Sequence, residues 1–114
     1  MKLHVTVKGR ERKLRLATFP GEISAEDARS ELVLHDLKPV GHEELEAVRV
    51  KYYNSGRKVG RPIVALDDVH HDGYTWVGCL ATKVSERLKN STAIHYFWAG
   101  RTWLPICTFL VESR

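Results

Sequence analysis

Lys2-Leu-His-Val-Thr-Val-Lys8 alternates polar and aliphatic residues without interruption. A period of two is typical of a strand with one buried face. After Gly9-Arg10, Leu14 and Leu16 belong to a second alternating run that reaches Phe19. The pattern therefore predicts a β-hairpin with glycine in its turn, which Pro20-Gly21 ends.

The rest of the chain predicts one main helix and several short strands. Ser24-Ala-Glu-Asp27 has the pattern of a capping box, so a helix is expected over about residues 24–34, burying Ala28, Leu32 and Val33. Residues 42–53 are ambiguous, because 42–47 contains helix formers while aliphatic and basic residues alternate after it, and a strand at 45–53 is favoured. Further strands are expected at 63–66, 74–82, 92–98 and 102–111, with a polar loop at 67–73 and two helical turns at 83–89. Because few helices separate the strands, the sequence predicts an α+β fold: a mainly antiparallel sheet or small SH3-like barrel of about six to seven strands.

Length and composition favour one small globular domain. The chain has 114 residues, of which 43% are hydrophobic and 28% charged. We expect a single domain over residues 1–114, with the hairpin and helix in 1–40 and a β-rich portion in 41–114. No apolar run approaches the roughly 20 residues that cross a bilayer, and the start of the chain has no apolar signal core. A cytoplasmic location without membrane contact is therefore expected.

Charge is segregated along the chain, although the net charge is only +4. Residues 1–20 carry six basic residues and one acid, whereas residues 21–50 carry three basic residues and eight acids. Residues 51–66 contain four basic residues and no acid, residues 67–78 contain three acids, and residues 79–114 contain five basic residues and two acids. Such patches matter more to a binding partner than the net charge does.

The segment from Lys51 to Arg61 is the main functional candidate. It combines four cations, two tyrosines and two glycines in eleven residues. Cations pair with phosphates, tyrosines stack on unpaired bases, and glycines permit close approach of the backbone. The alternative is a solvated hairpin loop with its tyrosines packed at the base. Contacts to nucleic acid are predicted for Lys51, Tyr52, Tyr53, Arg57, Lys58, Arg61 and Arg101.

Other candidates have simpler structural explanations. His70-His71-Asp72 has no matching ligand pair at a recognisable spacing, so a polar turn is favoured over a metal site. Trp98 and Trp103 flank a turn that contains Arg101, and they are either core partners or, if exposed, a stacking surface. The two cysteines lack the spacing of a metal or redox motif and are expected to be reduced core residues. No metal or other cofactor is predicted.

From Leu45 onward, the order of sequence pieces resembles the MazF/PemK family of toxin endoribonucleases. The matching pieces, within residues 45–111, are Val48-Arg-Val-Lys-Tyr-Tyr53, the basic stretch 54–60, Arg61-Pro62-Ile-Val-Ala-Leu66, Val77-Gly-Cys-Leu-Ala-Thr-Lys83 and the run from Leu104-Pro105 to Val111. Ala81 stands where the family has one member of a Thr/Ser pair. The resemblance implies metal-independent cleavage of single-stranded RNA by its own 2′-hydroxyl.

In that case Arg61 would stabilise charge on the scissile phosphate and Thr82 would position the phosphate through its hydroxyl. The resemblance also implies a homodimer and an inhibitory protein partner. The alternative hypothesis is a non-catalytic β-rich binding or accessory module of a mobile element, such as a phage, plasmid or gene cassette, that acts through a protein partner. The acidic stretch between basic flanks suits this second hypothesis.

Overall fold

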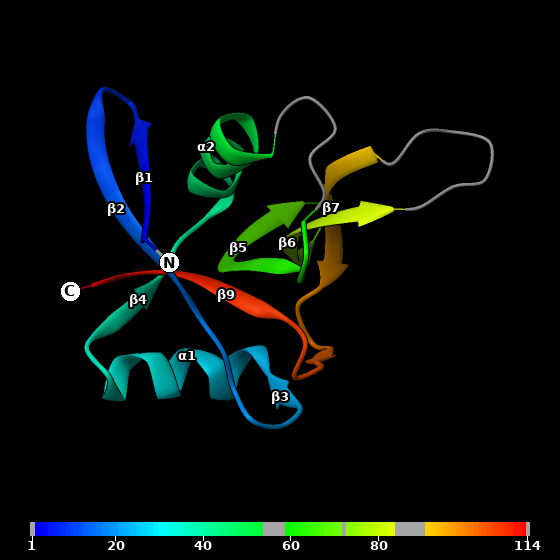
Figure 1. The fold of residues 1–114 in the computed structure, drawn as a ribbon. Coiled ribbons are helices and arrows are strands. Elements are labelled where there is room, and N and C mark those ends of the chain that lie inside the picture. Colours follow the sequence, from blue (N-terminus) through cyan, green and yellow to red (C-terminus); the bar gives the residue numbers. More distant parts are fainter. Residues whose placement is uncertain (1, 54–58, 72, 84–90, 114) are drawn as a thin grey trace.

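The computed structural model describes residues 2–53, 59–71, 73–83 and 91–113 (Figure 1). These residues form the elements β1 (Lys2–Val7), β2 (Arg10–Ala17), β3 (Ile23–Ser24), α1 (Ala25–Leu34), β4 (Leu37–Pro39), α2 (His42–Tyr52), β5 (Ile63–His71), β6 (Tyr74–Lys83), β7 (Ser91–Trp98), β8 (Thr102–Trp103) and β9 (Thr108–Ser113). Neither helix of this described part is long and apolar enough to cross a membrane.

Most strands belong to one seven-stranded sheet. Its order is β1-β2-β9-β5-β6-β7, and β4 pairs with β9 as well. The β5–β9 pair is parallel, and the other pairs formed by the described strands are antiparallel. The N-terminal hairpin is part of this sheet because β2 pairs with β9. The predicted α+β class, with a mainly antiparallel sheet, is confirmed.

The two helices cover opposite faces of the sheet, α2 above and α1 below in Figure 1. Strand β5 shows how one sequence run serves both faces. Ile63 and Ala65 are buried with the cluster that includes α2, whereas Val64 and Leu66 are buried with the cluster that includes α1. Successive side chains of a strand point to opposite faces, so a strand covered on both faces has a continuous apolar run.

The predicted N-terminal hairpin and first helix are both present. Ser24 caps α1, because its Oγ accepts a hydrogen bond from the backbone N–H of Asp27 at 3.1 Å. Ala28 and Leu32, four residues apart, are buried on the same face of α1. Val33 is 48% exposed because it lies off that face, so its expected burial is wrong.

The strand expected at 45–53 is wrong, because residues His42–Tyr52 form α2 instead. A capping interaction begins this helix: the backbone N–H of Gly41 donates to the Glu44 carboxylate at 3.2 Å. The two acids in the first turn, at 43 and 44, also favour a helix N-terminus electrostatically. The alternation of aliphatic and basic residues that indicated a strand is local, and packing of the helix overrides it.

Packing of α2 against the sheet explains why these residues form a helix and not a strand. Leu45 and Val48 are three residues apart and both are fully buried, whereas Val50 is half exposed. Gly78 of β6 permits a close approach of α2 and β7. A Cβ atom at Gly78 would lie 3.3 Å from Leu45 Cδ2 and 3.6 Å from Ile94 Cγ2, so even alanine would require the Leu45 side chain to shift by a few tenths of an ångström.

Two further boundaries differ from expectation. The polar loop expected at 67–73 is wrong, because β5 continues to His71 and pairs with β6 beyond a register shift. The strand expected at 102–111 is divided into β8 and β9, and Pro105, which has no N–H to donate, lies between them. The helical turns expected at 83–89 fall outside the described residues, except for the end of β6.

Candidate functional site

The Arg61 side chain is directed toward the segment that precedes β9. Its Nε donates to the carbonyl oxygen of Ile106 and its Nη2 donates to that of Pro105, both at 2.7 Å. Arg61 is exposed, yet two of its three guanidinium nitrogens hold this loop. The geometry is that of a loop anchor.

Thr82 occupies a different environment, near the end of β6. Its Oγ1 accepts a hydrogen bond from the backbone N–H of Val59 at 2.8 Å and is 2.7 Å from the hydroxyl of Thr92. β9 and β6 lie on opposite sides of β5 in the sheet. Arg61 thus contacts the segment before β9, and Thr82 contacts Val59 and Thr92, so the described hydrogen bonds of the two side chains share no partner.

Lys51, Tyr52 and Tyr53 lie at the C-terminal end of α2 and not in a loop. The Tyr52 hydroxyl accepts from the backbone N–H of His4 at 2.9 Å, and Lys51 Nζ donates to the carbonyl oxygen of the same residue. Burial raises the pKa of Tyr53 above its ordinary value. These contacts attach α2 to β1. Arg57 and Lys58 lie outside the described residues.

Arg101 stacks on the face of the sheet that α1 covers. Its guanidinium carbon lies 4.6 Å from the centre of the Phe97 ring and 4.9 Å from that of Trp103. Trp103 is only 2% exposed and meets Phe97 edge to face, so it is a core residue. The cation–π contacts stabilise this corner, and they direct Arg101 away from Trp98.

Four aromatic side chains share one face of β6 and β7, and we call this surface the aromatic face: Tyr74, Trp76, Tyr96 and Trp98. Trp76 is paired with Trp98 across the two strands, and Tyr96 is paired with Gly78. The exposed fraction is 63% for Tyr74, 61% for Trp98 and 43% for Tyr96. A contiguous exposed patch of large rings is the mark of a binding surface.

Two neighbouring residues fix the orientation of these rings. The Tyr96 hydroxyl is hydrogen-bonded to Nδ1 of His42 on α2, and the two ring centres are 5.8 Å apart. Desolvation, and then the nearby charge of Glu46, raises the pKa of Tyr96. The Trp98 ring rests against Gly100, where a Cβ atom would lie 2.5 Å from the indole. The aromatic face is therefore partly preorganised.

Only part of the aromatic face was predicted from the sequence. Trp98 was predicted as a stacking candidate together with Trp103, but Trp103 is in the core. Tyr74 and Trp76 were not predicted as site residues. The signal was present, because residues two apart on a strand share a face, and Tyr74-Thr-Trp76 and Tyr96-Phe-Trp98 both repeat an aromatic residue at that spacing.

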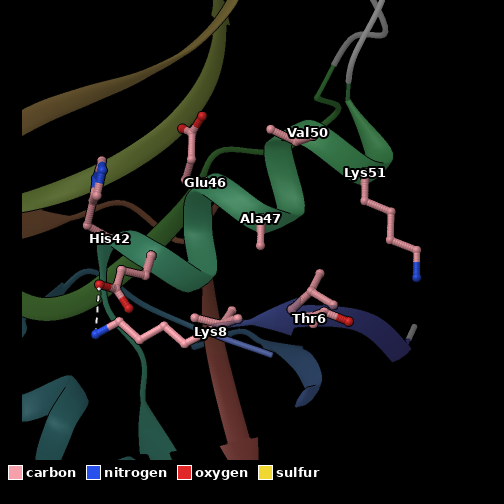
Figure 2. Close-up of a pocket in the computed structure, with 10 residues that line it drawn as sticks. Thr6, Lys8, His42, Glu46, Ala47, Val50 and Lys51 are labelled. Carbon is pink, nitrogen blue, oxygen red and sulfur yellow. Dashed lines mark ion pairs between the residues drawn. The ribbon is translucent and has the colours of Figure 1, made fainter. Parts of the chain in front are cut away.

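A hollow lies between β1 and α2 (Figure 2). We call it the edge groove. Its volume is about 720 Å³, and it is lined by Val5, Thr6, Val7, Lys8, His42, Glu43, Glu46, Ala47, Val50 and Lys51. Ala47 of the helix points toward Thr6 of β1 in Figure 2, and Lys8 forms an ion pair with Glu43 at 3.3 Å.

Neither cysteine has the environment of a nucleophile. Cys79 and Cys107 are buried and not bonded to each other. Burial raises the pKa of Cys79 to about 12 and also raises that of Cys107, so both remain thiols near neutral pH. Within the described ranges, no group of three or more His, Cys, Asp or Glu side chains is arranged to hold a metal ion.

In comparisons with protein-family models, curated proteins and solved structures, nothing matches this chain. The resemblance of residues 45–111 to MazF/PemK toxins therefore stays a prediction.

Proposed function

We propose that this protein binds single-stranded nucleic acid and that unpaired bases stack on the aromatic face. The observation that carries the proposal is the exposure of Tyr74, Tyr96 and Trp98 on one sheet surface. Stacking of a base on an aromatic side chain contributes about 1–3 kcal/mol and depends little on base identity. Rings spaced along two adjacent strands offer several such positions to one extended strand.

The charge of the chain favours a polyanionic partner. Two segments, 54–58 and 84–90, each contain two basic residues, and the second also contains one acid. Val59, which follows the first segment, is hydrogen-bonded to Thr82, and Thr82 is hydrogen-bonded to Thr92 just after the second. The described ends of both segments thus meet at one end of β6 and β7. Trp76 and Trp98 pair six residues away, about 20 Å along these strands, so one extended nucleic-acid strand would have to span that length to contact both regions.

The proposal is one of binding and does not include cleavage. In the toxins that the sequence resembles, the RNA 2′-hydroxyl attacks the scissile phosphate. That reaction needs a guanidinium and a hydroxyl directed at one phosphate. Here Arg61 donates to two backbone carbonyl groups, and Thr82 is engaged with Val59 and Thr92. A binding role uses the exposed rings and needs no such convergence.

We predict that Trp98→Ala weakens binding of a fluorescently labelled oligouridine roughly tenfold, because one stacking position is lost. Fluorescence anisotropy at low and moderate salt, with EDTA present, measures the dissociation constant. Gly100→Ala should weaken binding in the same direction, because the new methyl group displaces the Trp98 ring from its resting place. Affinity of the unmodified protein should fall as salt increases, since phosphate contacts release counterions.

Leu104→Ala is the matched control, because Leu104 is 55% exposed but lies off the aromatic face. It should leave the affinity within about twofold of the original value. If the protein does not bind the oligonucleotide at low salt, or if Trp98→Ala binds equally well, the proposal is wrong and the exposed rings serve a protein partner. If the RNA is cleaved in EDTA and Arg61→Ala abolishes the cleavage, the toxin-type mechanism is supported instead.

A further inference from the structure

We propose that the edge groove accepts an extended, acidic segment of a partner protein, which adds to the free edge of β1 as a short strand. This surface is distinct from the aromatic face, although His42 borders both, and the proposal does not depend on nucleic-acid binding. β1 is the first strand in the sheet order, and β2 is its only neighbour in the part of the sheet that the structure describes. The groove runs along its other edge (Figure 2).

The backbone of β1 determines where a strand can add. In an antiparallel pair, alternate residues direct both their N–H and C=O groups away from the partner strand. His4 is one of these residues, because its N–H and C=O contact Tyr52 and Lys51 of α2 instead of β2. Thr6 is the next such residue. Its backbone groups face the groove, and no partner for them is found among the described residues.

The wall and floor of the groove supply apolar contacts for the added segment. Val50, on α2, is 50% exposed, and Ala47 lies one helical turn before it. Val5 and Val7 are nearly buried where they line the strand side. A strand paired with Thr6 would direct alternate side chains toward α2, as in other complexes in which a peptide pairs with an edge strand.

Charge decides which occupant the groove suits. Lys8 and Lys51 stand at its two ends, and the exposed fraction of the Lys8 side chain is 77%. The two acids of the lining are each neutralised, Glu43 by Lys8 and Glu46 by Arg49. Lys51 meets a backbone carbonyl group and, in the described structure, no carboxylate. An acidic segment would therefore gain an ion pair at this end.

The same charges argue against pairing with a second copy of the chain. An antiparallel β1–β1 contact centred on Thr6 would place His4 opposite Lys8, and the backbone groups of His4 are already bonded to α2. Such a contact would bring the basic edges of two copies together. A flexible acidic segment avoids this repulsion and needs only the two backbone groups of Thr6.

The proposal is tested with two N-acetylated, fluorescently labelled peptides of the repeating types Glu-Val and Lys-Val. The intact protein should bind the Glu-Val peptide more tightly, and the amide signal of Thr6 should shift in a heteronuclear NMR spectrum. Thr6→Pro, which removes the free N–H, and Ala47→Arg, which fills the groove, should each weaken binding at least about tenfold. Lys51→Gln should weaken it severalfold at low salt.

Thr6→Val is the matched control, because it retains the N–H, and its affinity should stay within about twofold. The Thr6 N–H does not pair with β2, so proline there leaves the β1–β2 ladder intact, and thermal unfolding confirms that each variant is folded. Equal binding of the two peptides, or unchanged affinity in both Thr6→Pro and Ala47→Arg, would overturn the proposal. A monomer-to-dimer shift that Thr6→Pro abolishes, without peptide binding, would also overturn it in favour of self-association.

Discussion

Replacing Leu45 by alanine is expected to lower the free energy of unfolding by about 3 kcal/mol. Leu45 is fully buried on α2 and packs against Gly78 of β6. Truncation of a buried leucine removes its transfer free energy and leaves a cavity that the surroundings only partly fill. Equilibrium denaturation in urea, monitored by far-ultraviolet circular dichroism, measures the change.

Val50→Ala on the same helix is the control for this prediction. Val50 is half exposed, and alanine has the higher helix propensity, so the free energy of unfolding should change by less than about 0.5 kcal/mol. The two variants together distinguish the helix from the strand first expected here. A strand would place residues 48, 50 and 52 on one face, so a loss at Val50 larger than that at Leu45 would contradict the helix.

Arg12→Leu is expected to cost about 2 kcal/mol, because Arg12 links β2 to β9 and to α2. Its Nε and Nη2 donate to the Glu112 carboxylate, the second at 3.0 Å, and its Nη1 donates to Glu44 at 3.1 Å. The exposed side-chain fractions of these three residues are 20%, 16% and 14%. Loss of the guanidinium would leave two poorly hydrated carboxylates, with Lys38 as the remaining partner of Glu112.

The same substitution should change the response of stability to acid. The hydrogen bond from Arg12 lowers the pKa of Glu112 in the folded state. A lowered folded-state pKa contributes stability above the unfolded-state value, near 4.3, and this stability is lost as the pH falls through the folded-state pKa. Arg12→Leu raises that pKa, so the decrease in unfolding free energy from about pH 5 downward should become smaller.

Lys8→Leu provides the comparison, because the Lys8–Glu43 pair is exposed, with side-chain fractions of 77% and 53%. Its loss should change stability by less than about 0.5 kcal/mol, and salt should reduce even that difference. Denaturation series at pH 7 and at several lower values measure both effects. An equal loss in Lys8→Leu and Arg12→Leu would show that the contacts of Arg12 are no stronger than a surface ion pair.

Short-range patterns in the sequence were sufficient for much of the fold. The hairpin follows from two alternating runs on either side of Gly9, and α1 follows from the Ser24 cap. The region around Val48 was misinterpreted because aliphatic residues alternate with basic ones there, which imitates a strand. The local evidence for a helix, the acids at 43 and 44, competed with that pattern, and the deciding evidence was non-local, since it depends on the room that Gly78 leaves for Leu45. Such contacts between distant segments cannot be read from a short window.

The candidate sites also depend on contacts between distant segments, which short sequence patterns did not predict. The Lys51–Arg61 segment attracted attention as a basic loop, but Lys51 and Tyr52 are on a helix and hold β1. The pairing of Trp76 with Trp98 depends on the register of β6 and β7, which adjacent residues do not determine. The edge groove requires β1 and α2 to meet, and it was therefore invisible before the tertiary structure was known.

The position of β9 has a consequence for how the chain is made. β9 pairs with β2 on one side and with β4 and β5 on the other. All three of its neighbours precede it in the chain, so a ribosome must synthesise them before the strand that joins them exists. The sheet that joins β2 to β4 and β5 can therefore be completed only after residues 108–113 have emerged. Until that moment, β2, β4 and β5 each lack a neighbour on one edge, and such unpaired edges are sites at which chains can associate wrongly.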